Sequence, residues 1–423
     1  MSWASVTLGE VSTNIQTGPF GSQLHQSDYS DGGVPVVMPK DLVDGHISED
    51  SIARVSMNHV DRLSRHKIEV GDILYSRRGD VGRCAFATEV EQGWLCGTGC
   101  LRVTIDQSKA IPKFIFYQLQ KAETIGWVEK HAVGSTMLNL NTSILGSVPI
   151  ELPSMAEQQM IVHVLSAYDD LIENNQKQIK LLEEAAQRLY KEWFVDLRFP
   201  GHETTPIVDG IPQGWEKCLL SDIIGYEIGG GWGEEKPTEK CDIPAYVIRG
   251  TDLYGVTHGD SVDIPYRFHE KKNLDARRLA DGDIIFEVSG GSKTEGVART
   301  ALIRSAMLEQ WSEPAMCASF CKLIRVREPK YAQLLFNTFQ YMRASGKTTE
   351  YDKRSASSIV NYRWKDFLAT ETVLIPDEVM LEKYNALANN MYQLIVQKSI
   401  SIEKAKGARD RLLPKLVSGE IEV

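Results

Sequence analysis

The chain of 423 residues lacks long apolar runs, a disulfide pattern and any excess of positive charge. No stretch approaches the roughly 18 consecutive apolar residues of a membrane-spanning helix, and the N-terminus lacks a basic segment followed by an apolar run. Its seven scattered cysteines are odd in number, which disfavours a disulfide framework and favours reduced thiols. We therefore expect a soluble, cytoplasmic protein without membrane contact, and 42% hydrophobic residues suffice for two or three cores.

Positive charge is scarce, because 47 Lys and Arg residues face 57 Asp and Glu residues, for a net charge of -10. Contacts to nucleic-acid phosphates rely on Lys and Arg. No segment of the chain is net basic, so any nucleic-acid surface must be a local basic patch with acidic residues turned elsewhere. Non-specific DNA binding by the chain alone is therefore expected to be weak.

Catalytic motifs are missing as well. The chain has no Asn-Pro-Pro-aromatic motif and no clear cluster of nuclease carboxylates, and its nine histidines show no metal-ligand or triad spacing. The run Gly291-Ser292-Lys293-Thr294 resembles a phosphate-binding loop, but that motif requires glycine directly before the lysine. We therefore expect no catalytic site, no metal and no cofactor on this chain.

Two segments carry apolar residues at alternating steps of three and four, the heptad pattern of long paired helices. The first seam consists of Ile161, Leu165, Tyr168, Ile172, Asn175, Ile179, Leu182, Ala186, Leu189 and Trp193. The second consists of Tyr384, Ala388, Met391, Ile395, Lys398, Ile402, Ala405, Arg409, Leu412 and Leu416. Each position of the second seam lies 223 residues after its counterpart, which indicates an internal repeat.

Each seam predicts a helix of about 40 residues, or roughly 60 Å at 1.5 Å per residue. An ordinary core helix is the alternative, although such helices usually span only about 8–20 residues. Ser154 and Glu157 fit a capping box at the first helix start, and Asp377 holds the matching position of the second. If the helices pair about a twofold axis they run antiparallel, and the polar residues Asn175 and Lys398 approach one another and set the register.

The segments before the two seams also correspond. Each contains a Gly-Asp turn followed by an apolar strand and, further on, two cysteines four residues apart. These features are Gly71-Asp72-Ile73-Leu74 with Cys96 and Cys100, and Gly282-Asp283-Ile284-Ile285 with Cys317 and Cys321. Short apolar runs between Gly, Pro and Asp predict mixed sheets with a few helices. Each cysteine pair lies in a strand-like run, on one face of it, and small buried residues are the simplest interpretation.

The expected fold is α+β, with two similar mixed α/β domains separated by two long antiparallel helices that form a coiled-coil spacer in a pseudo-twofold internal repeat. The predicted divisions are 1–153 for the first domain, 154–199 for the central helix, 200–215 for a linker, 216–376 for the second domain and 377–423 for the C-terminal helix.

Several motifs, in this order, resemble the specificity subunit of type I restriction-modification systems. They are Gly-Pro-Phe-Gly-Ser-Gln-Leu at 18–24, Gly-Asp-Ile-Leu-Tyr-Ser-Arg-Arg-Gly at 71–79, Gly-Ser-Thr-Met-Leu-Asn-Leu-Asn at 134–141, the segment 153–159, and Arg-Leu-Leu-Pro-Lys-Leu-Val-Ser-Gly-Glu-Ile at 411–421. The resemblance covers nearly the whole chain. It implies two target recognition domains that each read one half of a split double-stranded DNA site.

The same resemblance implies helices that dock two methyltransferase subunits and, through them, restriction/translocase subunits. S-adenosylmethionine, ATP and magnesium are then expected on those partners. Two rigidly spaced readers contact half-sites best when these lie about one helical turn, roughly 34 Å, apart. Because the two domains differ in sequence and loops, we expect two different half-sites and an asymmetric target.

In the first domain, the glycines of the loop 17–23 permit close approach to DNA, and glutamine can pair with adenine. The segment 75–83 places three arginines around two glycines at the end of a predicted strand, which suits phosphate or guanine contacts. A plain turn and a solvated charge run are the respective alternatives. The candidate DNA-binding residues of this domain are Gly18, Phe20, Ser22, Gln23, Lys40, Arg77, Arg78, Gly79 and Arg83.

In the second domain, the loop after the strand that begins at Gly282-Asp283 is interpreted as facing DNA. Lys293 and Arg299 are its expected contacts to the DNA backbone. The candidate residues here are Arg249, Ser292, Lys293, Thr294 and Arg299. Phe20 and Trp232 are candidates for wedging or stacking on bases, with burial in the core as the alternative.

Large residues at the helix ends are interpreted either as core of the helix pair or as anchors for partner subunits. Together with the two polar seam residues, the candidates for helix pairing or partner docking are Asn175, Lys398, Tyr190, Trp193, Phe194, Leu412 and Leu413.

Three other functions stay open. A single-chain methyltransferase or nuclease would require cofactor or metal motifs that the sequence lacks. If the chain were a coiled-coil adaptor without DNA contact, neutralising Arg77, Arg78 and Lys293 would leave DNA binding by the assembled complex unchanged. A specificity subunit of a methylation-only system, or of a related defence system without the nuclease, has the same sequence features.

Overall fold

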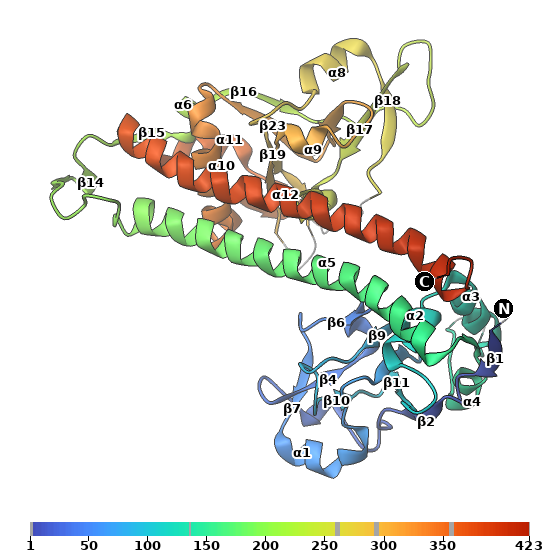
Figure 1. Cartoon of the computed structure of the whole chain (residues 1–423). Helices are drawn as coiled ribbons and strands as arrows, with labels where there is room; N and C mark the ends of the chain where they lie inside the picture. Colours follow the sequence, from blue (N-terminus) through green and yellow to red (C-terminus); the bar gives the residue numbers. More distant parts are fainter. Residues whose placement is uncertain (1–2, 135–136, 259–262, 292–295, 355–358, 423) are drawn as a thin grey trace. The chain divides into compact units, whose positions relative to one another are not determined.

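The computed structural model describes residues 3–134, 137–258, 263–291, 296–354 and 359–422 (Figure 1). It divides into two compact units. Unit 1 comprises 1–169 and 407–423, and unit 2 comprises 170–406. The two long helices, α5 (Met155–Tyr190) and α12 (Glu378–Val417), each contribute residues to both units. The unit boundary therefore falls within these helices, whereas the sequence divisions were drawn at their ends.

Unit 1 contains two four-stranded sheets. The first has the order β2-β11-β8-β9, with β2 (Ser12–Thr17), β11 (Cys100–Ile105), β8 (Ile73–Ser76) and β9 (Cys84–Phe86) all antiparallel. The second has the order β10-β4-β7-β3, with β10 (Leu95–Cys96), β4 (Val34–Val37), β7 (Ala53–Val55) and β3 (Tyr29–Ser30), and the pair β10–β4 is parallel. Two small antiparallel pairs join β1 (Ala4–Thr7) to β12 (Pro149–Leu152) and β5 (Leu42–Val43) to β6 (His46–Ile47).

Short helices surround these sheets. They are η1 (Gln26–Asp28), η2 (Pro39–Asp41), α1 (Met57–Arg62), η3 (Ser64–His66), α2 (Pro112–Leu119), α3 (Ala122–His131) and α4 (Thr142–Gly146). The core contains the fully buried Tyr75, Phe114 and Tyr117, and the ends of both long helices close it through Ile161, Leu165 and Leu416.

Unit 2 repeats this topology. The sheet β16-β23-β19-β21 consists of β16 (Ile224–Gly229), β23 (Cys321–Val326), β19 (Ile284–Glu287) and β21 (Thr300–Leu302). The sheet β18-β17-β22 consists of β18 (Tyr266–His269), β17 (Ile243–Ile248) and β22 (Ala315–Cys317), and its β17–β22 pair is parallel like β4–β10. β15 (Glu216–Leu219) pairs with β26 (Thr372–Ile375) as β1 pairs with β12.

Unit 2 also has a third sheet and several helices. The extra sheet contains β20 (Ser289–Gly290), β25 (Val360–Tyr362) and β24 (Asp352–Arg354), and β13 (Ile207–Val208) pairs with β14 (Ile211–Pro212). The helices are α6 (Leu220–Ile223), η5 (Gly250–Asp252), α7 (Leu253–His258), α8 (Lys271–Arg277), α9 (Ser305–Leu308), η6 (Pro329–Tyr331), α10 (Ala332–Ala344), η7 (Lys347–Tyr351) and α11 (Trp364–Thr370). The predicted α+β class and the internal repeat are confirmed.

The long helices begin where their caps predict. The Ser154 backbone N–H donates to Glu157 Oε2 at 2.9 Å and the Glu157 backbone N–H donates to Ser154 Oγ at 3.3 Å, which completes the capping box. The Met380 backbone N–H donates to Asp377 Oδ1 at 3.0 Å. Helix α5 continues past Tyr190 as a π-helical turn, η4 (Lys191–Val195). Among the described residues, no helix combines the length and the apolar content needed to cross a membrane.

Within unit 2, α5 and α12 lie side by side and antiparallel (Figure 1). Seam residues Ile179, Ile395 and Ile402 are buried. The sequence predicted that Lys398 approaches Asn175, but the hydrogen bond of the Asn175 side-chain amide goes to Ser401 Oγ, at 3.2 Å. The register of the helix pair is therefore set one turn further along α12 than the symmetric pairing assumed.

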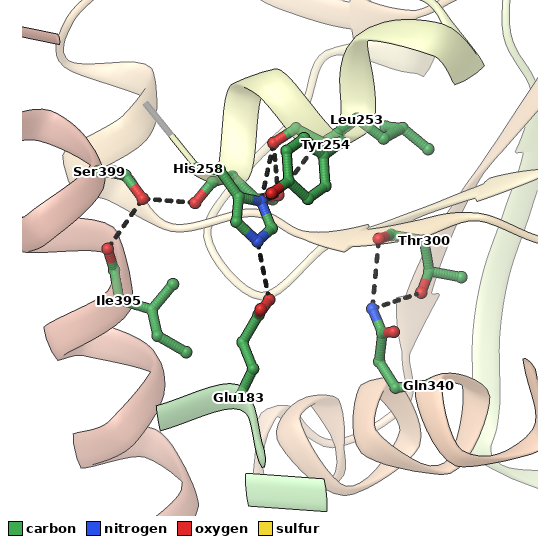
Figure 2. A network of polar contacts seen from close by, with 9 residues as sticks. Glu183, Leu253, Tyr254, His258, Thr300, Gln340, Ile395 and Ser399 are labelled. Atoms are coloured by element: carbon green, nitrogen blue, oxygen red, sulfur yellow. Dashed lines mark hydrogen bonds and ion pairs between the residues drawn. The ribbon is translucent and has the colours of Figure 1, made fainter. Parts of the chain in front are cut away.

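Polar contacts attach the short helix α7 to both long helices in unit 2. The His258 ring Nε2 lies 2.9 Å from Glu183 Oε1 of α5, and the ring stacks on Tyr254 with 3.8 Å between centroids. The hydroxyl of Ser399 in α12 lies within hydrogen-bond distance of the carbonyls of Ile395 and Thr257. Figure 2 shows this network, which connects α7 to α5 and α12.

All seven cysteines are free thiols. Cys96 and Cys100 were predicted in one strand-like run, which is wrong, because Cys96 ends β10 and Cys100 begins β11. The residues between them form a turn, closed by the Cys100 backbone N–H donating to Gly97 O at 3.1 Å. Both thiols are nevertheless fully buried in one core cluster, and burial raises the pKa of Cys96 to about 12. The interpretation as small core residues is confirmed.

Candidate DNA interface

The loop after β2 in unit 1 is tied down by backbone contacts. The Gly18 backbone N–H donates to Cys100 O at 2.9 Å, and a Cβ on Gly18 would lie only 1.8 Å from Gly97 O. The Gln23 side-chain oxygen accepts from the Phe20 backbone N–H at 3.0 Å. Phe20 itself is 51% exposed, so its burial in the core, the alternative interpretation, is wrong. The glycine therefore allows close packing that presents an aromatic ring to solvent.

Arg77 follows β8 and reaches the same ring. Its backbone N–H donates to Gly99 O at 2.9 Å, its carbonyl accepts from the Leu140 N–H at 2.8 Å, and its guanidinium carbon lies 5.9 Å from the Phe20 ring centroid. This geometry is a cation–π contact. The structure therefore brings together Phe20, Arg77 and Leu140, one residue from each of three predicted segments.

The other cations predicted in unit 1 stand on the surface in local pairs. Arg83 Nε lies 2.6 Å from Asp80 Oδ2, and Lys40 Nζ donates to Ser51 O at 2.6 Å. Arg78, Gly79 and the neighbouring Ser22 are exposed. Exposed ion pairs contribute roughly 0–1 kcal/mol, so a phosphate can compete with Asp80 for the Arg83 side chain.

Unit 2 carries an equivalent loop after β16. The Gly230 N–H donates to Cys321 O at 2.9 Å, matching the Gly18–Cys100 contact, and a Cβ on Gly230 would lie 2.2 Å from Ala318 O. Trp232, at the position corresponding to Phe20, is 42% exposed. The Arg267 guanidinium carbon lies 5.1 Å from the centroid of its ring. For Trp232, too, burial in the core is wrong.

The two arginines of unit 2 that were predicted to contact DNA are each paired with a carboxylate. Arg299 donates to Glu287 through Nε at 2.8 Å and Nη2 at 2.6 Å, and the Glu287 side chain is 2% exposed. Arg249 donates to both carboxylate oxygens of Asp252, at 2.9–3.1 Å. Such pairs hold their guanidinium groups to the fold. Ser292, Lys293 and Thr294 lie outside the described residues.

A basic turn adjoins the aromatic loop in each unit. In unit 1, Gln16 Nε2 donates to Arg65 O at 2.5 Å, and Arg65 Nε donates to His66 Nε2 at 3.0 Å. Burial, with the positive charges of Arg65 and Arg102 as smaller causes, lowers the pKa of His66 to about 4, so the imidazole is neutral at pH 7 and accepts this bond. In unit 2, Arg277 Nε of α8 donates to Gly229 O at 2.9 Å.

Sequence reasoning missed Arg267 and these basic turns. The Gly-to-aromatic spacing of 18–20 and 230–232 was visible as a repeat, but no repeat signal marks Arg267, because it belongs to β18 whereas Arg77 follows β8. The cation beside each ring therefore comes from a different part of each domain.

The helix-end residues lie mainly in the core. Trp193 and Phe194 pack on Tyr384 with ring centroids 5.8 and 4.8 Å apart, and Tyr190 stacks on Phe194 at 5.2 Å. All are buried, as is Leu413, whereas Leu412 is half-buried. Of the two interpretations, the structure favours helix-pair core. Lys398 of α12 is half-buried.

A different pair of residues is apolar and exposed on the long helices. Leu171 of α5 is 43% exposed and Leu394 of α12 is 44% exposed. They are 223 residues apart and thus occupy equivalent positions of the repeat. Seven residues before each, on the same helix face, lie Val164 and Leu387, and Leu387 is 45% exposed.

Comparison with known proteins places the chain among relatives of one kind. The family model described as type I restriction modification DNA specificity domain matches residues 1–184. The MjaIX specificity subunit of a type I restriction enzyme from Methanocaldococcus jannaschii is 27% identical over 424 residues, which cover 94% of this chain and 88% of that protein. The MjaVIII specificity subunit from the same organism is 24% identical over 327 residues, or 73% of this chain and 70% of that protein.

A solved structure supports the fold. The S subunit of a type I restriction-modification system from M. genitalium superposes with a TM-score of 0.59 at 14% identity, covering 98% of this chain and 96% of that chain.

Proposed function

We propose that this chain is a DNA specificity subunit of a type I restriction-modification system, and that its two recognition domains each read one half of an asymmetric, bipartite DNA site. In this role the chain recognises DNA sequence and is not itself an enzyme. The observation that carries the proposal is the repeated loop. At equivalent positions, a glycine-anchored loop presents an exposed aromatic beside an arginine in each unit.

The differences between the two loops support an asymmetric site. Phe20 and Arg77 form the ring and cation of unit 1, and Trp232 and Arg267 form those of unit 2. Arg77 follows β8, whereas Arg267 lies in β18. Side chains that reach base edges in the DNA grooves read the sequence. Two domains with different side chains in their equivalent loops therefore select different bases.

The decisive experiment maps methylated adenines in DNA exposed to this chain together with its methyltransferase partner. A split motif with two unlike halves is expected. A continuous or palindromic motif would contradict the proposal. Binding measured over a range of salt concentrations adds a check against the adaptor without DNA contact, because phosphate contacts make affinity fall with salt.

The two long helices are the proposed docking sites for two methyltransferase subunits, one on each copy of the repeat. Exposed Leu171 and Leu394 support this, because a repeated apolar residue on two solvent-facing helix positions suits two copies of one partner. Restriction/translocase subunits would join through those partners, and a system without the nuclease is the alternative that co-purification separates.

Single substitutions test the docking. Leu171→Glu and Leu394→Glu are each expected to lower the number of bound methyltransferase subunits from two to one, and the double variant to none, as counted by native mass spectrometry. Lys180→Ala on the exposed side of α5 is the control and keeps both. Two bound subunits on the double variant would place the docking surface elsewhere.

A further inference from the structure

Phe20 and Trp232 share position, exposure and electrostatic surroundings. Each lies two residues after a glycine whose N–H is bound to the first residue of the strand β11 or β23. Both rings remain about half exposed. Single exposed apolar residues are common on protein surfaces and need no function. Equivalent exposure in two domains whose loops otherwise differ is the feature that calls for an explanation.

An arginine lies beside each of the two exposed rings. By the 211-residue offset of the Gly-Asp turns, Arg77 corresponds to Val288, whereas Arg267 lies in β18, the strand of unit 2 that corresponds to β7 of unit 1. Inheritance from a common repeat therefore does not account for both cations. Each domain nevertheless places a guanidinium within 6 Å of the exposed ring, at 5.9 Å from Phe20 and 5.1 Å from Trp232. Two arginines at non-equivalent positions therefore lie beside two equivalent rings. This indicates that the ring and the cation have the same role in both domains.

The chemistry of the pair suits an opened base step. A phenylalanine ring has no hydrogen-bonding atom, and tryptophan has one donor, so neither can distinguish the edges of the four base pairs. Apolar side chains instead insert between stacked base pairs and unstack them, and aromatic rings stack on exposed base faces. The neighbouring guanidinium carries the positive charge that backbone phosphates attract at such a step.

We propose that Phe20 and Trp232 are wedge residues, one for each half-site, which insert at a base step of bound double-stranded DNA while Arg77 and Arg267 hold the flanking phosphates. This rests on the proposed function and adds a role distinct from reading base edges. Hydrogen-bonding side chains of the same loops, such as Ser22, supply sequence information, and the rings supply stacking.

The experiment uses the complex of this chain with its methyltransferase partner on the mapped site, with 2-aminopurine replacing, one at a time, the adenines that are not methylated. The methylated adenines are left in place because a methyltransferase itself flips its target base out of the stack. The wild-type complex is expected to raise 2-aminopurine fluorescence at a position in each half, because unstacking relieves quenching. Phe20→Ala should abolish the rise in one half only, and Trp232→Ala in the other, so the untouched half serves as an internal control. Val90→Ala, which removes a 63% exposed apolar side chain elsewhere in unit 1, should leave both rises intact.

Affinity provides the second measurement. Loss of base–aromatic stacking is expected to weaken binding by about 5- to 100-fold in either alanine variant. Phe20→Leu, which keeps an apolar wedge, should retain part of the fluorescence rise. Both rings are exposed, so neither substitution removes a core residue.

The outcomes separate the two proposals. A bipartite motif with fluorescence rises that persist in Phe20→Ala and Trp232→Ala, or with no rise in the wild-type complex, overturns the wedge and leaves the bipartite reading intact. A continuous or palindromic motif overturns the bipartite reading, and the wedge for two half-sites falls with it. Variants that lose methyltransferase subunits rather than DNA contacts would show that the rings dock protein, which also overturns the wedge.

Discussion

The side-chain amide of Asn175 donates to the hydroxyl of Ser401 at 3.2 Å, in the largely apolar seam between α5 and α12 of unit 2. Asn175 is 6% exposed, so its hydrogen bond is largely shielded from water. A single buried polar residue in such a seam favours one register of the helix pair, because sliding would leave the amide unpaired among isoleucines.

Replacing either partner of this hydrogen bond tests what the buried amide contributes to stability. Ser401→Ala leaves the buried amide without its partner and is expected to destabilise the protein by about 1–3 kcal/mol. Asn175→Leu removes the polar group altogether and is expected to be neutral or stabilising, because an apolar residue suits the seam. Thermal denaturation of both variants provides the measurement. A loss of stability in Asn175→Leu as large as that in Ser401→Ala would contradict the interpretation.

Arg299, which is paired with Glu287, contrasts with Arg77, which is proposed to contact DNA. Arg299→Ala would leave the buried Glu287 carboxylate without its two-point contact, and we expect a loss of about 3–5 kcal/mol in stability. Combining it with Glu287→Gln should recover part of this loss, because the buried charge is removed as well. Arg77→Ala, in contrast, should weaken DNA binding and leave the melting temperature nearly unchanged. Equal thermal stability of Arg299→Ala and the wild type would show that the ion pair does not support the fold.

These two arginines also show where sequence reasoning succeeds and where it stops. Constant spacing between repeats predicted the helices and their caps, because period and local hydrogen bonding are properties of neighbouring residues. It could not tell Arg299 from Arg77, since the carboxylate that captures Arg299 belongs to the adjacent strand β19. Lys398 was chosen opposite Asn175 by symmetry, whereas the register depends on how two helix surfaces fit together. Arg267 had no counterpart in the other domain and therefore gave no signal.

His66 gives unit 1 a predictable response to pH. Burial lowers its pKa from 6.5 to about 4, so between these values the unfolded chain binds a proton that the folded chain does not. Its contribution to stability is complete above pH 6.5 and is lost progressively as the pH falls towards 4. In His66→Gln, the fall in unfolding free energy between pH 7 and pH 4.5 should shrink by about 2–3 kcal/mol. Chemical denaturation at the two pH values tests this, and an unchanged fall in the variant would show that His66 is not the residue responsible.

The glycines at the base of the two aromatic loops offer a matched pair of substitutions. A Cβ at Gly18 would lie 1.8 Å from Gly97 O, and one at Gly230 would lie 2.2 Å from both Ala318 O and Cys317 O. In each case the obstructing atom is backbone, so alanine must displace the whole loop and with it Phe20 or Trp232. Gly21 and Gly229, in or next to the same loops, have no atom within 4 Å of an added Cβ.

Gly18→Ala is therefore expected to weaken specific DNA binding at least tenfold and to erase or alter one half of the methylated motif, and Gly230→Ala to do the same to the other half. Gly21→Ala and Gly229→Ala should keep the motif and the affinity of the wild type. Methylation mapping and competition binding with the methyltransferase complex measure both effects. If either tight-site variant changed both halves of the motif equally, the loops would not be acting as separate readers, because a displaced loop alters only the bases that its own domain contacts.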